Sequence, residues 1–116
     1  MELCQEVYRL SATFPKDELY GLTSQIRRSA VSVPSNIAEG QARNTQKEFI
    51  HFLNVSYGSL AELETQLIIS VQVDYTRQDN IALILSKIQE IGRMIKSLIR
   101  SLEKSRPQPL ALTTKN

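Results

Sequence analysis

The clearest hydrophobic pattern in the chain lies in its last third, where large apolar side chains recur at alternating steps of three and four residues. The positions are Ile81, Ile84, Ile88, Ile91, Ile95, Leu98 and Leu102. This spacing places them on one face of a helix, and it predicts an amphipathic helix that ends near Lys104 and packs against other helices. A dedicated coiled-coil dimer through the same face is the alternative.

Three more segments show helical periodicity, and their expected bounds are residues 2–13, 18–42 and 46–73. Pro15 ends the first because proline disfavours a helical conformation in the residue before it. Asp17 is positioned to cap the second. Thr45 and Glu48 have the spacing of a capping box for the third. Four helices with short connections predict an all-α, antiparallel up-and-down four-helix bundle over residues 1–104. Residues 105–116 contain two prolines and no periodicity, so we expect a flexible C-terminal tail.

The second predicted helix contains a proline and a line of polar residues. Pro34 lacks an amide hydrogen and clashes with the carbonyl four residues earlier, so we expect a kinked second helix at Pro34, or a short break. Ser32 and Ser35 are positioned to bond the freed backbone groups. Polar side chains at steps of three or four share one helix face, which is either solvated or a buried network or interface. They are Gln25, Arg28, Ser32, Asn36 and Glu39.

The third predicted helix is apolar on two sides, which is typical of a central helix or of an oligomer contact. Its first line is Phe49, Phe52, Ser56, Leu60, Leu63, Leu67 and Val71. Its second line is Ile50, Tyr57, Ala61 and Ile68. Gly58 in mid-helix costs about 1 kcal/mol relative to Ala, so we expect a close helix crossing there that offsets this cost.

Two segments together resemble a known family. GLTSQIRRSAVSVPSNIAEG, residues 21–40, and KEFIHFLNVSYGSLAELETQL, residues 47–67, are similar to the four-helix-bundle proteins encoded in intervening sequences of bacterial 23S rRNA genes. The resemblance implies a left-handed up-and-down bundle that assembles as a homopentameric ring. It also implies structural similarity to the accessory subunit of diversity-generating retroelements, which binds nucleic acid and a reverse transcriptase. Members of the family usually have a longer first helix than the one expected here.

The charge of the chain is unevenly distributed. The net charge is only +2, but residues 87–116 contain seven basic residues against two acidic ones. Four of them, Arg93, Lys96, Arg100 and Lys104, form a stripe on the fourth helix, which Lys87 and Arg106 extend. With Arg27 and Arg28 of the second helix, the stripe is a candidate nucleic-acid-binding surface. The alternative is a solvated cationic face near a helix C-terminus.

Opposite charges on the second and third helices are candidates for a structural or intersubunit contact. If these helices fold back about Ala42, Arg28 lies level with Ser56, and an intrachain pair with Glu62 or Glu64 requires a stretch of about one and a half turns. A bridge between subunits is the alternative. Such a buried pair would specify geometry more than it would add stability.

No reaction is indicated by the side chains available for chemistry. Glu48 and His51 match half of a di-iron motif, but the chain has one histidine and cannot complete the site. Arg43 and His51 are eight residues apart, beyond the short Arg–His spacing of helical ribonucleases. Cys4, the single cysteine, has no partner for a disulfide or a metal knuckle. We therefore expect no metal, no cofactor and no enzymatic activity.

The expected function is that of a non-enzymatic, self-assembling scaffold or adaptor that contacts RNA, DNA or a nucleic-acid enzyme such as a reverse transcriptase. A protein–protein interaction module without nucleic-acid binding is the first alternative, and a ribonuclease is a weaker one. No apolar run reaches the ~18 residues that a membrane span needs, and the N-terminus has no basic-then-apolar signal pattern. The expected location is the bacterial cytoplasm, without membrane partners.

Overall fold

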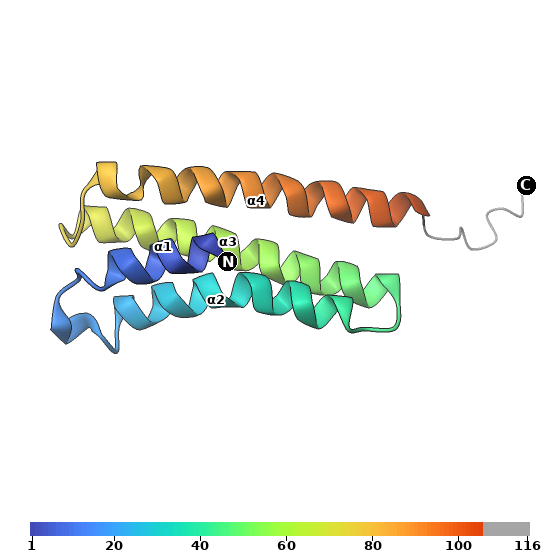
Figure 1. The fold of residues 1–116 in the computed structure, drawn as a ribbon, viewed down its shortest axis with the longest axis horizontal. Coiled ribbons are helices and arrows are strands. Elements are labelled where there is room, and N and C mark those ends of the chain that lie inside the picture. Colours follow the sequence, from blue (N-terminus) through green and yellow to red (C-terminus); the bar gives the residue numbers. More distant parts are fainter. Residues whose placement is uncertain (106–116) are drawn as a thin grey trace, which may run out of the picture.

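The structure is a computed structural model that describes residues 1–105. These residues form four α-helices and one short 3-10 helix, η1. The elements are α1 (Glu2–Ser11), η1 (Lys16–Glu18), α2 (Leu22–Gln41), α3 (Gln46–Gln72) and α4 (Gln78–Ser105). Successive α-helices run in opposite directions (Figure 1). Both α1 and α3 pack against α2 and α4. The predicted antiparallel four-helix bundle is therefore confirmed. Of the predicted tail, Ser105 belongs to α4, and residues 106–116 lie outside the described residues.

The core contains apolar side chains from all four α-helices. Its buried members are Leu3, Val7, Phe14, Ile26, Ala30, Val33, Leu53, Leu60, Leu63, Leu67, Ile81, Ile84, Ile88, Ile95 and Ile99. On α4 the predicted face holds to Ile95, and then Ile99 rather than Leu98 is buried. A straight helix turns about 20° per heptad relative to a strict seven-residue pattern. The buried face therefore moves by one position near the end of α4.

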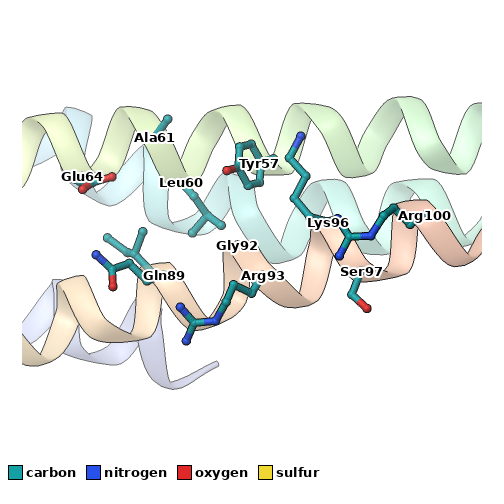
Figure 2. A pocket seen from close by; sticks show the side chains of 11 residues that line it. Tyr57, Leu60, Ala61, Glu64, Gln89, Gly92, Arg93, Lys96, Ser97 and Arg100 are labelled. Atoms are coloured by element: carbon teal, nitrogen blue, oxygen red, sulfur yellow. The ribbon is translucent and has the colours of Figure 1, made fainter.

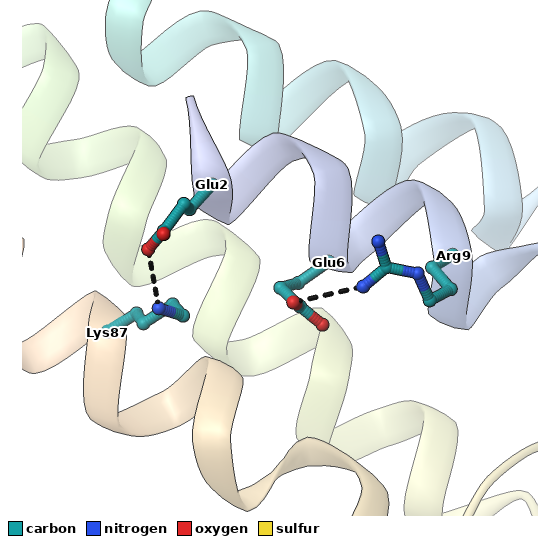
Figure 3. Close-up of polar contacts among 4 residues, drawn as sticks. All are labelled: Glu2, Glu6, Arg9 and Lys87. Atoms are coloured by element: carbon teal, nitrogen blue, oxygen red, sulfur yellow. Dashed lines mark hydrogen bonds and ion pairs between the residues drawn. The ribbon is translucent and has the colours of Figure 1, made fainter.

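The first helix covers only part of the bundle. With 10 residues against 28 in α4, α1 is about 15 Å long beside a helix of about 42 Å. Its N-terminus lies near the middle of the bundle in Figure 1. There Lys87 Nζ donates to Glu2 Oε1 at 2.9 Å (Figure 3). Beyond this point Met94 and Leu98 remain 63% and 38% exposed.

Pro34 lies inside α2, which is helical from Leu22 to Gln41 without a break. The carbonyl of Ala30, which loses its partner to the proline, accepts a hydrogen bond from Cys4 Sγ of α1 at 3.4 Å. Burial raises the pKa of the Cys4 thiol, so the sulfur keeps its donor hydrogen. The predicted local replacement by Ser32 and Ser35 was wrong, because a neighbouring helix supplies the donor. The kink at Pro34 stays a prediction.

Side chains cap the starts of α3 and α2. Thr45 Oγ1 accepts from the backbone amide of Glu48 at 3.1 Å, as the capping box predicted. The second helix starts at Leu22 rather than residue 18, because Lys16–Glu18 form η1. Glu18 Oε1, not Asp17, accepts the amide of Leu22 at 3.0 Å. The other oxygen of Glu18 accepts the Tyr75 hydroxyl at 2.5 Å, which joins η1 to the α3–α4 connection.

Acid is expected to weaken the fold in part through Glu18. The hydrogen bonds from Tyr75 and from the Leu22 amide hold the pKa of Glu18 below its ordinary value. Such a carboxyl stabilises the fold above its unfolded pKa, about 4.3, and this contribution is lost as the pH falls through the lower folded pKa. We expect the urea midpoint to decrease from about pH 5 to about pH 3, and Glu18→Gln to reduce that decrease.

The control for this measurement is Glu103→Gln, because Glu103 is an exposed carboxyl on α4. This variant should follow the pH dependence of the wild-type protein. An unchanged pH dependence in Glu18→Gln would show that the carboxyl does not contribute through its bonds to Tyr75 and Leu22.

Helices α2 and α3 approach each other closely at Gly40, a residue that the sequence did not single out. A Cβ atom at Gly40 would lie 2.9 Å from both Phe49 Cδ1 and Phe52 Cβ of α3. At Gly58, apart from the neighbouring residues and the local backbone of α3, no described atom lies within 4 Å of the Cβ position. The crossing predicted at Gly58 is therefore not made within the chain, and an interface role for Gly58 stays a prediction. The two helices approach closely where the Ala42–Thr45 connection draws their ends together.

Candidate functional site

A groove of about 560 Å³ runs between α3 and α4 (Figure 2). It is lined by Tyr57, Leu60, Ala61, Glu64, Ile88, Gln89, Gly92, Arg93, Lys96, Ser97 and Arg100. Leu60 and Ile88, which are nearly buried, provide its apolar base. Gly92 is buried and lets the Tyr57 ring lie close to α4, since a Cβ there would already touch Tyr57 Cε1 at 3.4 Å. The groove thus combines an apolar base with a charged edge.

Three cations of α4 line this groove. Arg93, Lys96 and Arg100 follow one another at steps of three and four residues, so they share one side of the helix. All three are exposed, and none forms an ion pair with another described residue. Lys104 is one further turn along α4, also exposed, and outside the groove lining. The groove therefore concentrates positive charge that is not held in an ion pair with any described side chain.

An aromatic ring lies beside these cations. Lys96 Nζ is 4.2 Å from the centroid of the Tyr57 ring, a cation–π contact between α4 and α3 that is visible in Figure 2. Tyr57 is 37% exposed, so its ring remains accessible from the groove. Glu64 is the one carboxylate in the lining, and it lies with Gln89 at the end opposite Arg100. The groove is consequently polarised along its length.

The predicted arginine pair of the second helix does not join this groove. Arg27 Nε donates to Ser11 Oγ at 2.8 Å, and its guanidinium lies 4.7 Å from the Tyr8 ring centroid, so Arg27 links α2 to α1. Arg28 is exposed and lines a different groove, between α2 and α3. The predicted extension by Lys87 also fails, because that ammonium binds Glu2 (Figure 3). Arg106 lies outside the described residues.

The polar line of α2 faces α3. Ser29 Oγ donates to Gln66 Oε1 at 2.9 Å in the interior, and Ser32 Oγ and Ser59 Oγ share a hydrogen bond of 2.8 Å. Asn36 Nδ2 donates to Ser32 Oγ, also at 2.8 Å. Ser29, Ser32 and Gln66 also line a groove of about 390 Å³ between α2 and α3. Its other lining residues are Gln25, Arg28 and Glu62. Farther along α2, Glu39 is exposed and pairs with Arg43 at 2.6 Å.

The register between α2 and α3 differs from the one expected. Ser56 Oγ donates to the carbonyl of Val33 at 2.8 Å, so Ser56 lies level with Val33 rather than Arg28. The chain turns after α2 ends at Gln41, and the pairing is displaced by the five residues from Arg28 to Val33, about one and a half helical turns. Arg28 and Glu62 consequently line the same groove, but they form no ion pair with each other.

The acidic pair of the third helix is divided between two grooves. Glu62 lines the α2/α3 groove, whereas Glu64 lines the α3/α4 groove. Two residues along an α-helix differ by about 200° in direction, so these carboxylates point to opposite sides of α3. They cannot act together on one arginine of the same chain.

Two groove residues were missed in the sequence. Tyr57 was assigned only to a second apolar line, and Gly92 was not singled out although it interrupts a run of large side chains on α4. Their role depends on which parts of α3 and α4 face each other.

His51 is exposed, and its ring meets the Phe52 ring edge-on, with 5.1 Å between the ring centroids. Arg43 lies 4.8 Å from the same Phe52 ring centroid, so Arg43 and His51 both flank this aromatic side chain.

Two further properties of the described residues concern binding partners. Within residues 1–105, no group of three or more His, Cys, Asp or Glu side chains is arranged to hold a metal ion. In the same part of the chain, no helix combines the length and apolar character that crossing a bilayer requires.

Comparison with known proteins shows a similar fold in a solved structure. The chain is similar to a crystal structure of a protein with unknown function from the S23 ribosomal protein family of Bacteroides thetaiotaomicron. The TM-score is 0.75 at 23% identity, and the match covers 84% of this chain and 92% of the other. No curated protein matches the chain. Residues 1–97 match the family described as 23S rRNA-intervening sequence protein. This match confirms the resemblance in the two helical segments, and the chain belongs to the 23S rRNA-intervening sequence protein family.

Proposed function

We propose that the protein is a non-enzymatic adaptor that contacts nucleic acid through the α3/α4 groove and the adjacent Lys104. The observation that supports this most directly is the row of Arg93, Lys96 and Arg100 along one groove, without ion pairs to other described residues. Unpaired cations on one helix face attract a phosphate backbone, and binding releases its condensed counterions. Arg27 is excluded from our proposed surface by its contacts with α1.

Affinity for nucleic acid is expected to depend steeply on salt. If all four cations contact phosphates, the logarithm of affinity should fall against the logarithm of salt concentration with a slope of about −3. Fluorescence anisotropy of labelled RNA and DNA oligonucleotides at several salt concentrations measures this slope. In a ring of several copies the groove would be repeated, so one polyanion contacting more than one copy would bind more tightly.

The test of the proposed surface is a charge reversal with a matched control. Arg93→Glu, Lys96→Glu and Arg100→Glu in one protein should abolish binding at moderate salt and flatten the salt dependence. The control, Lys16→Glu, Lys47→Glu and Arg77→Glu, changes the net charge equally at exposed positions outside the groove. An equal loss in both proteins would mean that net charge, and not the groove, attracts the oligonucleotide.

The second candidate function is a protein-interaction module that assembles with itself, and the α2/α3 groove favours it. Arg28 and Glu62 are exposed charges of opposite sign in that groove that do not pair with each other. Large apolar side chains, Val31, Val55 and Ile69, are also exposed on these two helices. Exposed apolar positions beside complementary charges suit an interface between copies. The family resemblance implies a pentamer for this assembly.

Exchange of the two charges tests this candidate. Arg28→Glu and Glu62→Arg are each expected to lower the mass measured by light scattering after gel filtration, because each places like charges in the groove. The double variant should recover the assembled mass, since the opposite charges then meet again. A wild-type monomer at micromolar concentration, or an unchanged mass in both single variants, would contradict assembly through this groove.

A further inference from the structure

The groove between α3 and α4 contains a feature that phosphate binding alone does not use. Tyr57 presents part of its ring to the groove, and the ammonium of Lys96 lies over this ring, 4.2 Å from its centroid. Building on the proposed function, we infer that the groove binds single-stranded nucleic acid, with one unpaired base stacked on Tyr57 in place of Lys96. The exchange leaves Lys96 free to contact a phosphate.

The base of the groove suits the flat face of a nucleobase. Leu60 and Ile88 make it apolar, and the missing side chain at Gly92 lets the Tyr57 ring lie against α4 at the edge of this apolar base. Aromatic side chains in such grooves stack bases without sequence preference, because every base has a π-face. In a duplex these faces are already covered by neighbouring base pairs. The ring is therefore useful only to a strand whose bases are unpaired.

The spacing of the cations also fits one strand. From Arg93 to Arg100 is seven residues, or about 10.5 Å along α4. At about 3.4 Å per nucleotide in one stacked strand, this length corresponds to about three phosphates. Lys96 lies between the two arginines and above the ring, so a base on Tyr57 would place its own backbone beside this row.

The carboxylate of Glu64 influences which side of the groove the backbone of the bound strand follows. Glu64 and Gln89 lie at the end of the groove away from Arg100 (Figure 2). Phosphates are repelled by Glu64 and attracted to the three cations, so the backbone should follow α4. The base then points across the groove toward α3, where Tyr57 is located.

The test compares one sequence in two forms. A labelled 12-nucleotide RNA without self-complementarity and its blunt duplex are titrated with the full chain at fixed salt. We expect the wild-type protein to bind the single strand more tightly. Tyr57→Leu, which keeps an apolar side chain but removes the ring, should weaken single-strand binding about tenfold and leave duplex binding unchanged. Tyr57→Phe keeps the ring and should bind within about twofold of wild type.

A second variant alters the packing beneath the ring without changing charge. Gly92→Leu should displace the Tyr57 ring, because even a Cβ at this position would touch it, and should weaken single-strand binding more than duplex binding. Circular dichroism verifies the helix content of this variant. Equal affinity of both forms, or Tyr57→Leu binding the single strand like wild type, would overturn the inference. The proposed function would still stand if the reversal of Arg93, Lys96 and Arg100 abolished binding. Absence of binding to either form by the wild-type chain would overturn both.

Discussion

Replacing Leu63 by Ala is expected to lower the free energy of unfolding by about 2–5 kcal/mol, the largest effect that we anticipate from one substitution. Leu63 is completely buried on α3, the helix that packs against both α2 and α4. Removing its terminal carbons loses their transfer from water and leaves a cavity between rigid helices. Because domains of this size have only about 5–15 kcal/mol of stability, urea unfolding should show a large decrease in midpoint.

The matched control is Leu83→Ala. Leu83 is on α4 and 58% exposed, so the same chemical change removes little buried surface. Its effect should stay within about 0.5 kcal/mol. A small effect of Leu63→Ala, similar to that of the control, would mean that the centre of α3 is not tightly packed.

Gly40→Ala is expected to destabilise the protein, with a net loss of up to about 2 kcal/mol. A methyl group at this position would meet Phe52 Cβ and Phe49 Cδ1 at 2.9 Å. Phe52 Cβ is attached directly to the backbone of α3, so relieving the contact requires the two helices to separate. Overpacking of this kind costs about 1–3 kcal/mol. The better helix propensity of Ala offsets about 1 kcal/mol of that cost.

Gly58→Ala provides the comparison, and its expected effect has the opposite sign. Apart from the neighbouring residues and the local backbone of α3, no described atom lies within 4 Å of the new methyl group. The change therefore keeps only the gain in helix propensity, about 0.5–1 kcal/mol. Urea unfolding of both variants at one protein concentration measures the difference. Stabilisation by Gly40→Ala would contradict the close crossing, and destabilisation by Gly58→Ala would point to a contact between copies.

The position of α3 connects the two proposed activities. Its Glu62 side lies in the groove considered for self-assembly, and its Tyr57 and Glu64 side lies in the groove considered for nucleic acid. Because these sides are on opposite flanks of one helix, assembly through α2 and α3 would leave the α3/α4 groove open. The charge exchange at Arg28 and Glu62 and the charge reversal on α4 therefore test independent surfaces.

Much of the architecture could be predicted from local order in the sequence. The alternating steps of three and four residues in α4, the capping pair Thr45 and Glu48, and the short connections were sufficient for four antiparallel helices. These signals lie within a few residues of one another, so they can be recognised without knowledge of any tertiary contact. The cationic row of α4 was found for the same reason, because Arg93, Lys96 and Arg100 share one helix face.

Contacts between helices could not be obtained in this way. The carbonyl of Ala30, freed by Pro34, accepts its hydrogen bond from Cys4, which is 26 residues away in the sequence. Lys87 forms an ion pair with Glu2, which lies near the start of the chain. Glu62 and Glu64 lie in different grooves because of the rotation of α3 relative to its neighbours. The contact between Tyr57 and Lys96 depends on the axial register of α3 against α4. Periodicity defines which face of a helix is apolar, but rotation and axial register depend on the packing of all four helices together.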